Sequence, residues 1–157
     1  MISIRPAGKE DFDSIQRIFA SAIRGLAKDH YTCEQIEVWA ERLDRESFTA
    51  SIEAGKVFVA EYDGEIAGFA QIDIPTGEVG SIYVSPEYAG RGIGSEMMIF
   101  VEDLASSHGV NSLFLRASLN AVPFYKKAGF VEEGEIVHQL DSTEFNCVIM
   151  RKVLEKH

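Results

Sequence analysis

The chain has 157 residues, of which 46% are hydrophobic and 25% are charged. This apolar content suffices for a hydrophobic core, so a disordered chain is excluded and one domain over residues 1–157 is expected. Acidic residues outnumber basic ones by 25 to 15, giving a net charge of −10. That charge repels nucleic-acid phosphates and anionic lipids, so neither is an expected partner. No apolar run reaches the roughly 18 residues of a membrane span.

The first residues and the cysteines predict a cytoplasmic protein. Residues 1–6 (Met-Ile-Ser-Ile-Arg-Pro) lack the basic start and the long apolar segment of a secretion signal. Cys33 and Cys147 fit no metal-ligand spacing, and two cysteines are too few for a disulfide framework. They are typical of small apolar residues in a reducing compartment, so neither a disulfide nor a metal is expected.

The first third of the chain is predicted to be mostly helical. Ile2–Arg5 alternates in polarity, as a short strand does. From Lys9 to about Ala27, apolar residues recur at helical spacing. Thr32, with Gln35 three positions on, is a capping pair for a second helix. A third short helix is expected around Glu46–Glu53.

The hydrophobic period then changes from helical to alternating or continuous. Val57–Ala60 predicts a strand, and Asp63-Gly64 is a strong signal for a two-residue hairpin turn. Ile66–Ile74 is the returning strand. Pro75–Gly77 forms the next turn, and Glu78–Val84 is the third consecutive strand. This part of the chain therefore predicts a three-strand meander.

The last third mixes both periods. Gly92–His108 predicts an amphipathic helix, and Leu113–Leu115 a short buried strand. A helix over Pro123–Ala128 follows, and two further strands lie around Phe130–Glu135 and Phe145–Lys152. Helices and strands in this order are typical of a mixed α/β domain.

The strongest local signal is a glycine-rich turn between a strand and a helix. Residues 89–95 read Ala-Gly-Arg-Gly-Ile-Gly-Ser. Alternate glycines let the backbone turn tightly and bring several N–H groups to the helix start, which is a site for a phosphate or pyrophosphate. Arg91 adds a positive charge. The Gly-x-Gly-x-Gly spacing excludes a Rossmann fingerprint, which needs Gly-x-Gly-x-x-Gly. A Walker loop is excluded too, because its Gly-Lys-Ser/Thr ending is absent.

Two blocks of this sequence resemble the GNAT N-acetyltransferase superfamily. Its acetyl-CoA loop reads Gln/Arg-x-x-Gly-x-Gly/Ala after the fourth strand, and Ile82–Tyr88 followed by Gly90–Gly94 is similar to that junction. The second block, a strand followed by Phe-Tyr and then Gly-Phe, is matched by Leu113–Leu115, Phe124-Tyr125 and Gly129-Phe130. One departure is Ala89, which stands where the family usually has Gln or Arg.

The resemblance covers nearly the whole chain and implies a GNAT-like α/β fold. In that fold a central, mostly antiparallel sheet has splayed fourth and fifth strands and is flanked by helices. The gap between those strands takes the pantetheine arm of acetyl-CoA, the implied acyl donor, along the backbone of the fourth strand. Gly80 makes a bulge plausible on that strand. The implied cofactor-binding residues are Ile82, Tyr83, Val84, Gly90, Arg91, Gly92, Ile93, Gly94, Ser95, Ser118, Asn120 and Tyr125.

Two of these residues are alternatives for one task. Ser118 stands where many members carry Asn, and Asn120 lies two positions on. Either side chain could cap the following helix and hydrogen-bond the pantetheine arm. The sequence does not choose between them.

The resemblance also assigns catalytic roles. The tyrosine at the position of Tyr125 protonates the departing CoA thiolate in this family, as a tyrosine hydroxyl near the sulfur can. Glu78 opens the strand before the loop, at the register where part of the family has its general-base glutamate. Asp73, His138 or a water chain are alternatives for that base. Because no covalent nucleophile stands out, direct attack in a ternary complex is expected.

The acceptor is expected to be a primary amine of a small molecule or a peptide. Tyr31 and Trp39 belong to the helical region that lies over the acceptor cleft in the resembled family. The acidic chain suits a cationic acceptor such as a polyamine. The competing hypothesis is a non-catalytic acyl-CoA-binding sensor or regulatory module. Families of this shape often form dimers, so a homodimer is one expectation.

Overall fold

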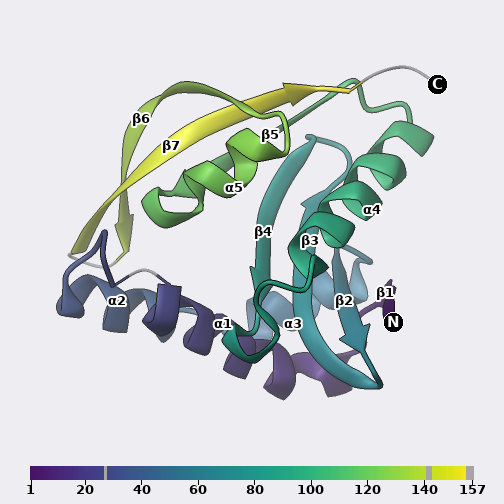
Figure 1. Ribbon diagram of the computed structural model, residues 1–157, viewed down its shortest axis with the longest axis horizontal. Helices are drawn as coiled ribbons and strands as arrows, with labels where there is room; N and C mark the ends of the chain where they lie inside the picture. The colour runs from purple at the N-terminus through teal and green to yellow at the C-terminus, as the bar shows by residue number, and fades with distance from the viewer. Residues whose placement is uncertain (27, 141–142, 155–157) are drawn as a thin grey trace.

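The computed structural model describes residues 1–26, 28–140 and 143–154. Their strands are β1 (Ile2–Pro6), β2 (Val57–Tyr62), β3 (Glu65–Asp73), β4 (Glu78–Val84), β5 (Ser112–Ser118), β6 (Val131–Leu140) and β7 (Thr143–Val153). They form a seven-stranded sheet in the order β1-β2-β3-β4-β5-β7-β6 (Figure 1). Neighbours are antiparallel except β4 and β5, which are parallel. The predicted mixed α/β fold with a mostly antiparallel sheet is confirmed.

Helices cover both faces of this sheet. The α-helices are α1 (Phe12–Leu26), α2 (Cys33–Ala40), α3 (Arg45–Glu53), α4 (Ile93–Ser107) and α5 (Val122–Lys127), and the short 3₁₀ turns are η1 (Lys9–Asp11), η2 (Pro86–Tyr88) and η3 (Leu119–Ala121). The first three helices pack on one face, and α4 and α5 pack on the other. Burial on both faces explains why β2 reads as a continuous apolar run. Within the described ranges, no helix is long and apolar enough to cross a membrane.

Short-range sequence features determine where several of these helices and strands begin or end. The Thr32 hydroxyl accepts from the Gln35 N–H at 3.1 Å, and the Gln35 amide oxygen accepts from the Thr32 N–H at 2.9 Å, so the predicted cap is confirmed. Asp63 and Gly64 both have positive φ, 50° and 85°, as the predicted hairpin turn requires. β6 extends beyond the predicted strand end at Glu135 because it pairs with β7 up to the hairpin.

β4 and β5 separate almost as soon as they meet. Among the described residues, the single strand pair between them joins Glu78 and Phe114. Beyond it, β4 stays paired with β3 and β5 stays paired with β7. The predicted splay is therefore confirmed, and it leaves most of one β4 edge without a strand partner among the described residues.

A bulge on β4 changes the direction of this free edge. Gln71 pairs with Ser81 and Ile72 pairs with Val79, so Gly80 is the extra residue. The predicted bulge at Gly80 is confirmed.

The hydrogen-bond pattern shows which groups face the gap. The Ser85 N–H donates to the Ala67 carbonyl at 2.8 Å, toward β3. Because bonding groups alternate along an antiparallel pair, the N–H groups of Ile82 and Val84 point the other way. The β4 backbone therefore offers hydrogen bonds to whatever enters the gap.

Candidate active site

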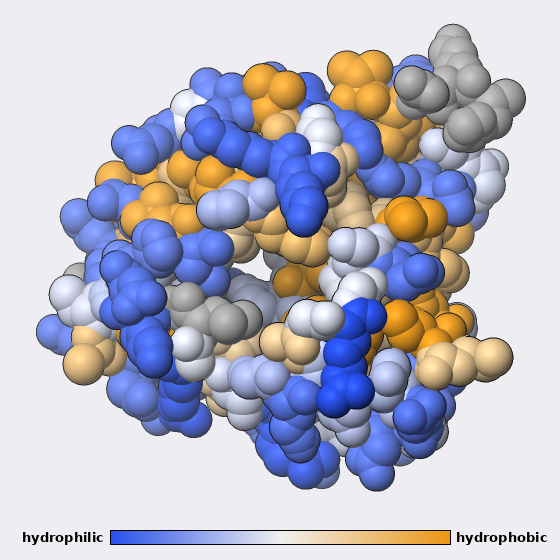
Figure 2. Space-filling view, viewed as in Figure 1, coloured by the Kyte–Doolittle hydropathy of each residue, from blue (hydrophilic) through white to orange (hydrophobic). Residues whose placement is uncertain are grey.

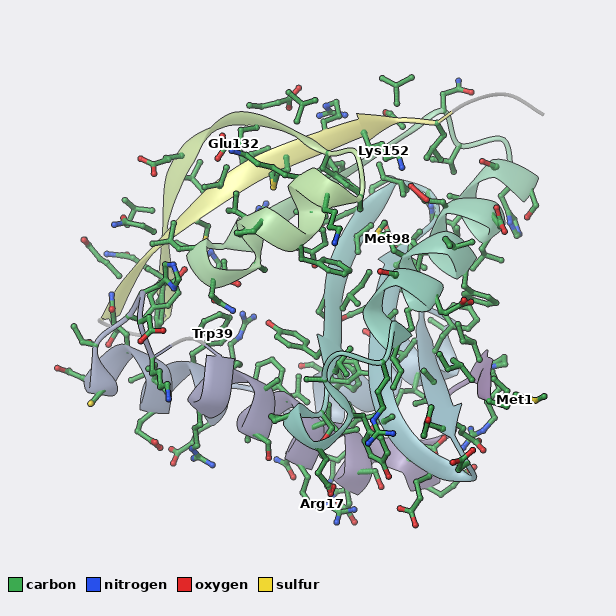
Figure 3. All side chains as sticks on the ribbon, viewed as in Figure 1. Met1, Arg17, Trp39, Met98, Glu132 and Lys152 are labelled. Atoms are coloured by element: carbon green, nitrogen blue, oxygen red, sulfur yellow. The ribbon has the colours of Figure 1, made fainter. Side chains whose placement is uncertain are left out.

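A cavity of about 310 Å³ lies where β4 and β5 diverge. Its lining residues belong to α2 and its flanking segments, and to β3, β4, β5, η3, α5, β6 and β7. The surface is hollowed between the part that holds α5, β6 and β7 and the part that holds α1 and α2 (Figure 2). Trp39 lies on the α2 side of this hollow (Figure 3).

Residues that the sequence singled out separately meet in this cavity. They come from α2 and the segment before it, and from β4, β5, α5 and β6, which are far apart along the chain. The sequence-predicted residues among its lining are Tyr31, Trp39, Glu78, Ile82, Tyr83, Ser118, Tyr125 and His138.

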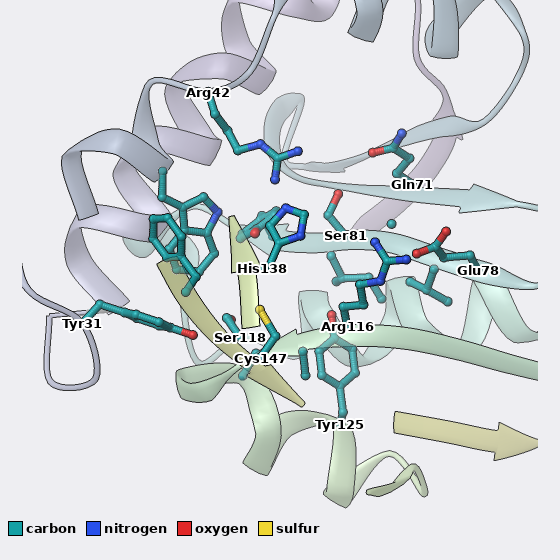
Figure 4. A pocket seen from close by; sticks show the side chains of 18 residues that line it. Tyr31, Arg42, Gln71, Glu78, Ser81, Arg116, Ser118, Tyr125, His138 and Cys147 are labelled. Carbon is teal, nitrogen blue, oxygen red and sulfur yellow. The ribbon is translucent and has the colours of Figure 1, made fainter. Parts of the chain in front are cut away.

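Tyr125 rises from α5 with its hydroxyl directed into the cavity (Figure 4). The ring is buried and packs edge-on against Phe124 and Phe130, with centroids 5.2 and 5.7 Å away. Gly129, at φ 101°, ends α5 and brings Phe130 back onto this ring. Burial raises the pKa of Tyr125, so the hydroxyl keeps its proton at neutral pH. The hydroxyl makes no hydrogen bond to another described residue.

Two candidate bases face the cavity from different walls (Figure 4). Glu78 lies at the start of β4, beside the point where β4 and β5 meet. His138 lies on β6. Its pKa is lowered by burial and by the nearby guanidinium groups of Arg42 and Arg116, so its imidazole is neutral near pH 7.

Asp73, the third candidate base, is engaged elsewhere. Its carboxylate accepts from the Thr76 hydroxyl at 2.5 Å and pairs with the Lys56 ammonium at 3.0 Å. These partners lower the pKa of Asp73 and tie it to the turn before β4. Asp73 is not among the residues that line the cavity. The structure therefore favours Glu78 and His138 over Asp73.

Tyr31 lines the cavity with a hydroxyl that is already used. It donates to the Asn146 carbonyl at 2.8 Å and accepts from the Leu119 N–H at 2.9 Å. Its ring packs edge-on against Trp39 at 5.3 Å. Tyr31 thereby joins the segment before α2 to β7 and η3, and it shapes the cavity wall.

Neither Ser118 nor Asn120 caps α5 with its side chain, which corrects the capping expectation. Ala121 is the N-cap of α5, and no side chain bonds there. Ser118 precedes η3, also without a capping bond, and lines the cavity. The Asn120 Oδ1 atom is buried and has no donor among the described residues. Such an orphan acceptor costs about 1–3 kcal/mol unless a ligand supplies the donor.

The glycine-rich turn, residues 90–95, forms an open cradle of backbone N–H groups at the start of α4. Gly90 and Gly92 both have φ of 79°, the left-handed region that glycine adopts without strain. The Glu96 N–H donates to the Gly92 carbonyl at 3.0 Å, so the N–H groups of residues 93–95 precede the first hydrogen bond of α4. A Cβ atom added at either glycine would meet no atom within 4 Å. The backbone here is open to a ligand.

The other residues of the turn have distinct surroundings. A Cβ atom at Gly94 would lie 3.1 Å from the Phe124 ring, so this glycine lets α4 approach α5. Arg91 donates to the Tyr62 hydroxyl at 3.2 Å and stacks over the rings of Tyr62 and Tyr88. Its charge is held beside the cradle by these aromatic rings.

Sequence reasoning missed several residues of the cavity. The polar side chains and the thiol among them are Arg42, Gln71, Ser81, Arg116 and Cys147, and the apolar ones are Val79, Ala117, Ala121 and Phe145. Arg42 lies two residues beyond the end of α2, and its N–H donates to the Trp39 carbonyl at 3.2 Å, so the helical pattern of α2 gave no signal for it. No local pattern brings Arg42 to Arg116.

The cysteines show no sign of an activated nucleophile. Cys147 lines the cavity half-buried, and burial raises the pKa of its thiol, which keeps it protonated. Cys33 is exposed at the start of α2 and does not line the cavity. Within the described ranges, no group of acidic, histidine and cysteine side chains is arranged to hold a metal ion.

Known proteins share both the sequence pattern and the fold. The family model of the acetyltransferase (GNAT) domain matches residues 27–152. The uncharacterized N-acetyltransferase YafP of Escherichia coli K12 is 30% identical over 129 residues, covering 82% of this chain and 81% of that protein. A GCN5-related N-acetyltransferase from Rhodopseudomonas palustris has a TM-score of 0.92 at 31% identity, covering 97% of this chain and 95% of that one. The PaiA N-acetyltransferase from Thermoplasma acidophilum, solved with coenzyme A, has a TM-score of 0.78 at 24% identity, covering 98% and 99%.

The sheet that splits between β4 and β5 and the glycine turn at the start of α4 are the two features that the family resemblance predicted. The chain belongs to the GNAT acetyltransferase family, as its two motif blocks predicted.

Proposed function

We propose that this protein transfers the acetyl group of acetyl-CoA to a primary amine by direct attack in a ternary complex. The observation that carries the proposal is the cavity that lies where β4 and β5 diverge. It brings a protonated tyrosine, two candidate bases and an unpaired strand edge together. A binding module would need the edge and the cradle but not the proton-handling groups.

The described residues fit acetyl-CoA. The turn at residues 90–95 offers open N–H groups for the pyrophosphate. The outward N–H groups of Ile82 and Val84 suit the pantetheine arm, and the orphan Oδ1 atom of Asn120 suits one of its amide N–H groups. Asn120 thereby becomes the better choice over Ser118. Acetyl-CoA supplies the acetyl group and leaves as a thiol.

The chain's own residues handle the protons. An amine with a pKa of about 10.4 arrives as an ammonium ion, so a base must take its proton before attack. Glu78 or His138 can do so directly or through one water. Tyr125 holds its proton at Oη, directed into the same cavity. The protonated Cys147 thiol is unsuited to attack, which favours direct transfer.

The names of relatives leave the charge of the acceptor open. A spermidine N(1)-acetyltransferase of Escherichia coli is 26% identical over 176 residues. A glucosamine 6-phosphate N-acetyltransferase of Trypanosoma brucei brucei is 30% identical over 84 residues. One name indicates a cationic acceptor and the other an anionic one, and both indicate an amine.

The proposed function predicts release of CoA thiol that depends on an amine. The protein is incubated with acetyl-CoA and a panel of primary amines, while free thiol and acetylated amine are measured together. We expect at least one amine to yield both products in equal amounts. Tight binding of CoA without amine-dependent thiol release across the panel would favour the sensor hypothesis.

Glu78→Gln tests the base through its pH dependence. We expect kcat/KM to fall most near pH 7, because almost all of the amine is then protonated, and to recover toward about pH 9 as more amine loses its proton in solution. A deficit that stays constant over this range would count against Glu78.

His138→Gln is the matched variant for the other base. Because the pKa of His138 is lowered from 6.5, its imidazole stays neutral, and so able to accept a proton, down to a lower pH than the imidazole of an ordinary histidine. If His138 is the base, the acidic limb of the kcat/KM profile lies below pH 6.5 and disappears in His138→Gln. If Glu78 is the base, that variant keeps the limb.

A further inference from the structure

Two arginines that the mechanism does not use face the cavity. Arg42 follows α2, and Arg116 lies on β5. Their guanidinium groups point into the cavity from different walls, with His138 in the same space (Figure 4). Both act on the His138 imidazole, whose pKa they lower, so both charges are close to it.

These arginines differ from most others in the chain by having no acidic partner. Neither Arg42 nor Arg116 lies within ion-pair distance of a carboxylate in the part of the chain that the structure describes. The chain has 25 acidic residues against 15 basic ones, so partners are plentiful. The arginines that do form ion pairs are Arg5, Arg24, Arg45 and Arg151.

The cavity is therefore locally positive in a negatively charged protein. Glu78 is the single acidic side chain among its described lining residues, and it lies at the other end of β4 from the glycine turn. Two like charges that face one space repel each other. An anion that binds between them removes this repulsion, because it attracts both charges. A guanidinium also presents a planar set of donors that matches a carboxylate or a phosphate.

Neutral donors complete the lining of this region. Ser81 and Gln71 reach the cavity from β4 and β3, and His138 carries one ring N–H in its neutral form. A carboxylate or phosphate has several lone pairs to satisfy, and hydroxyl, amide and imidazole N–H groups can share that task with the guanidinium groups. The side chains suit an anion with several oxygens.

We propose that the acceptor is an amine that also carries a carboxylate or phosphate group, which binds between Arg42 and Arg116. The ammonium of the same molecule then faces Glu78, the acidic group of the cavity. This inference rests on the proposed function and replaces the expectation of a polyamine, which took the net charge of −10 as the guide. The local charge of the cavity, rather than the net charge, selects the acceptor.

Matched pairs of acceptors test the anion directly. Ethanolamine phosphate is compared with ethanolamine, and alanine with alaninamide, by kcat/KM. We expect the anionic member of at least one pair to be favoured by about tenfold or more. The phosphate and carboxylate pairs distinguish the two kinds of anion. Equal or better use of ethanolamine and alaninamide, the two members without an anionic group, would overturn the inference while leaving the acetyltransferase function intact.

Arg42→Gln and Arg116→Gln test the residues. Glutamine keeps a polar side chain and removes the charge. Each variant is expected to lower kcat/KM for the acceptor that carries the anionic group roughly 10- to 100-fold, mainly through KM. The value for the matched acceptor without that group should change little. Arg17→Gln is the control, because it removes the same charge from an exposed arginine that contacts Ser14 at 3.1 Å outside the cavity.

A binding measurement keeps the test independent of turnover. Trp39 is the single tryptophan of the chain and lines the cavity, so its fluorescence reports occupancy. In protein saturated with CoA, the favoured anionic acceptor should give a saturable change that weakens in both cavity variants but not in Arg17→Gln. If neither anion gave a saturable change, the inference would be wrong whatever the turnover.

CoA itself is the other candidate for these charges. If Arg42 and Arg116 held its phosphates, the two variants would lose affinity for CoA rather than for the acceptor, and this result would also overturn the inference. Absence of thiol release with every amine would instead contradict the proposed function, while the Trp39 titration would still decide whether the anion site exists.

Discussion

Tyr125→Phe is expected to lower kcat by about 10²- to 10⁴-fold, or about 3–5 kcal/mol of transition-state stabilisation. The variant keeps the ring and its contacts with Phe124 and Phe130. It removes a hydroxyl that is directed into the cavity and holds its proton because burial raises its pKa. Since that hydroxyl bonds to no other described residue, its loss leaves no protein group unpaired. CoA affinity, from calorimetry, and thermal stability should therefore change little.

Tyr31→Phe provides the contrast between a structural and a catalytic hydroxyl. Its removal leaves the Leu119 N–H and the Asn146 carbonyl without their partner, which costs about 1–3 kcal/mol of stability. Its main effect should be a lower melting temperature. If Tyr125→Phe behaved like Tyr31→Phe, or kept a normal kcat, Tyr125 would be a packing residue.

Features set by neighbouring residues were predictable from the sequence. The Thr32–Gln35 cap and the Asp63-Gly64 turn depend on contacts within four positions, and both occur as predicted. The bulge at Gly80 follows from a glycine inside a strand. The splay of β4 and β5 came from the family resemblance rather than from any period in the sequence, because it depends on which strands pair.

Features set by distant neighbours were not predictable in the same way. Whether Asp73 is a free base depends on Lys56, and whether Asn120 finds a donor depends on how η3 packs. Arg42 and Arg116 are ordinary charged residues in the sequence, and they face one another only because the segment after α2 and β5 line the same cavity. Net charge describes the average surface and favours a cationic acceptor, whereas the proposed anionic acceptor follows from the charges that line the cavity.

Gly92→Val is expected to lower the affinity for CoA by more than about 100-fold. Gly92 has φ of 79° at the N-terminus of α4, where its carbonyl accepts the first hydrogen bond of the helix. A valine side chain would extend into space that holds no atom within 4 Å and would cover the N–H groups of the first turn. The affinity is measured by calorimetry, and the fold is checked by circular dichroism.

Gly109→Val separates the loss of the cradle from backbone strain. Gly109 has the same φ of 79°, and a Cβ atom there would also meet nothing within 4 Å, but it lies beyond the opposite end of α4. A β-branched residue in this conformation costs about 1–2 kcal/mol at either position, so both variants should melt at similarly lowered temperatures. Because only Gly92 adjoins the open N–H groups, only Gly92→Val should lose CoA affinity. Equal affinities in the two folded variants would mean that the phosphates bind elsewhere, since the strain is matched and the cradle is the remaining difference.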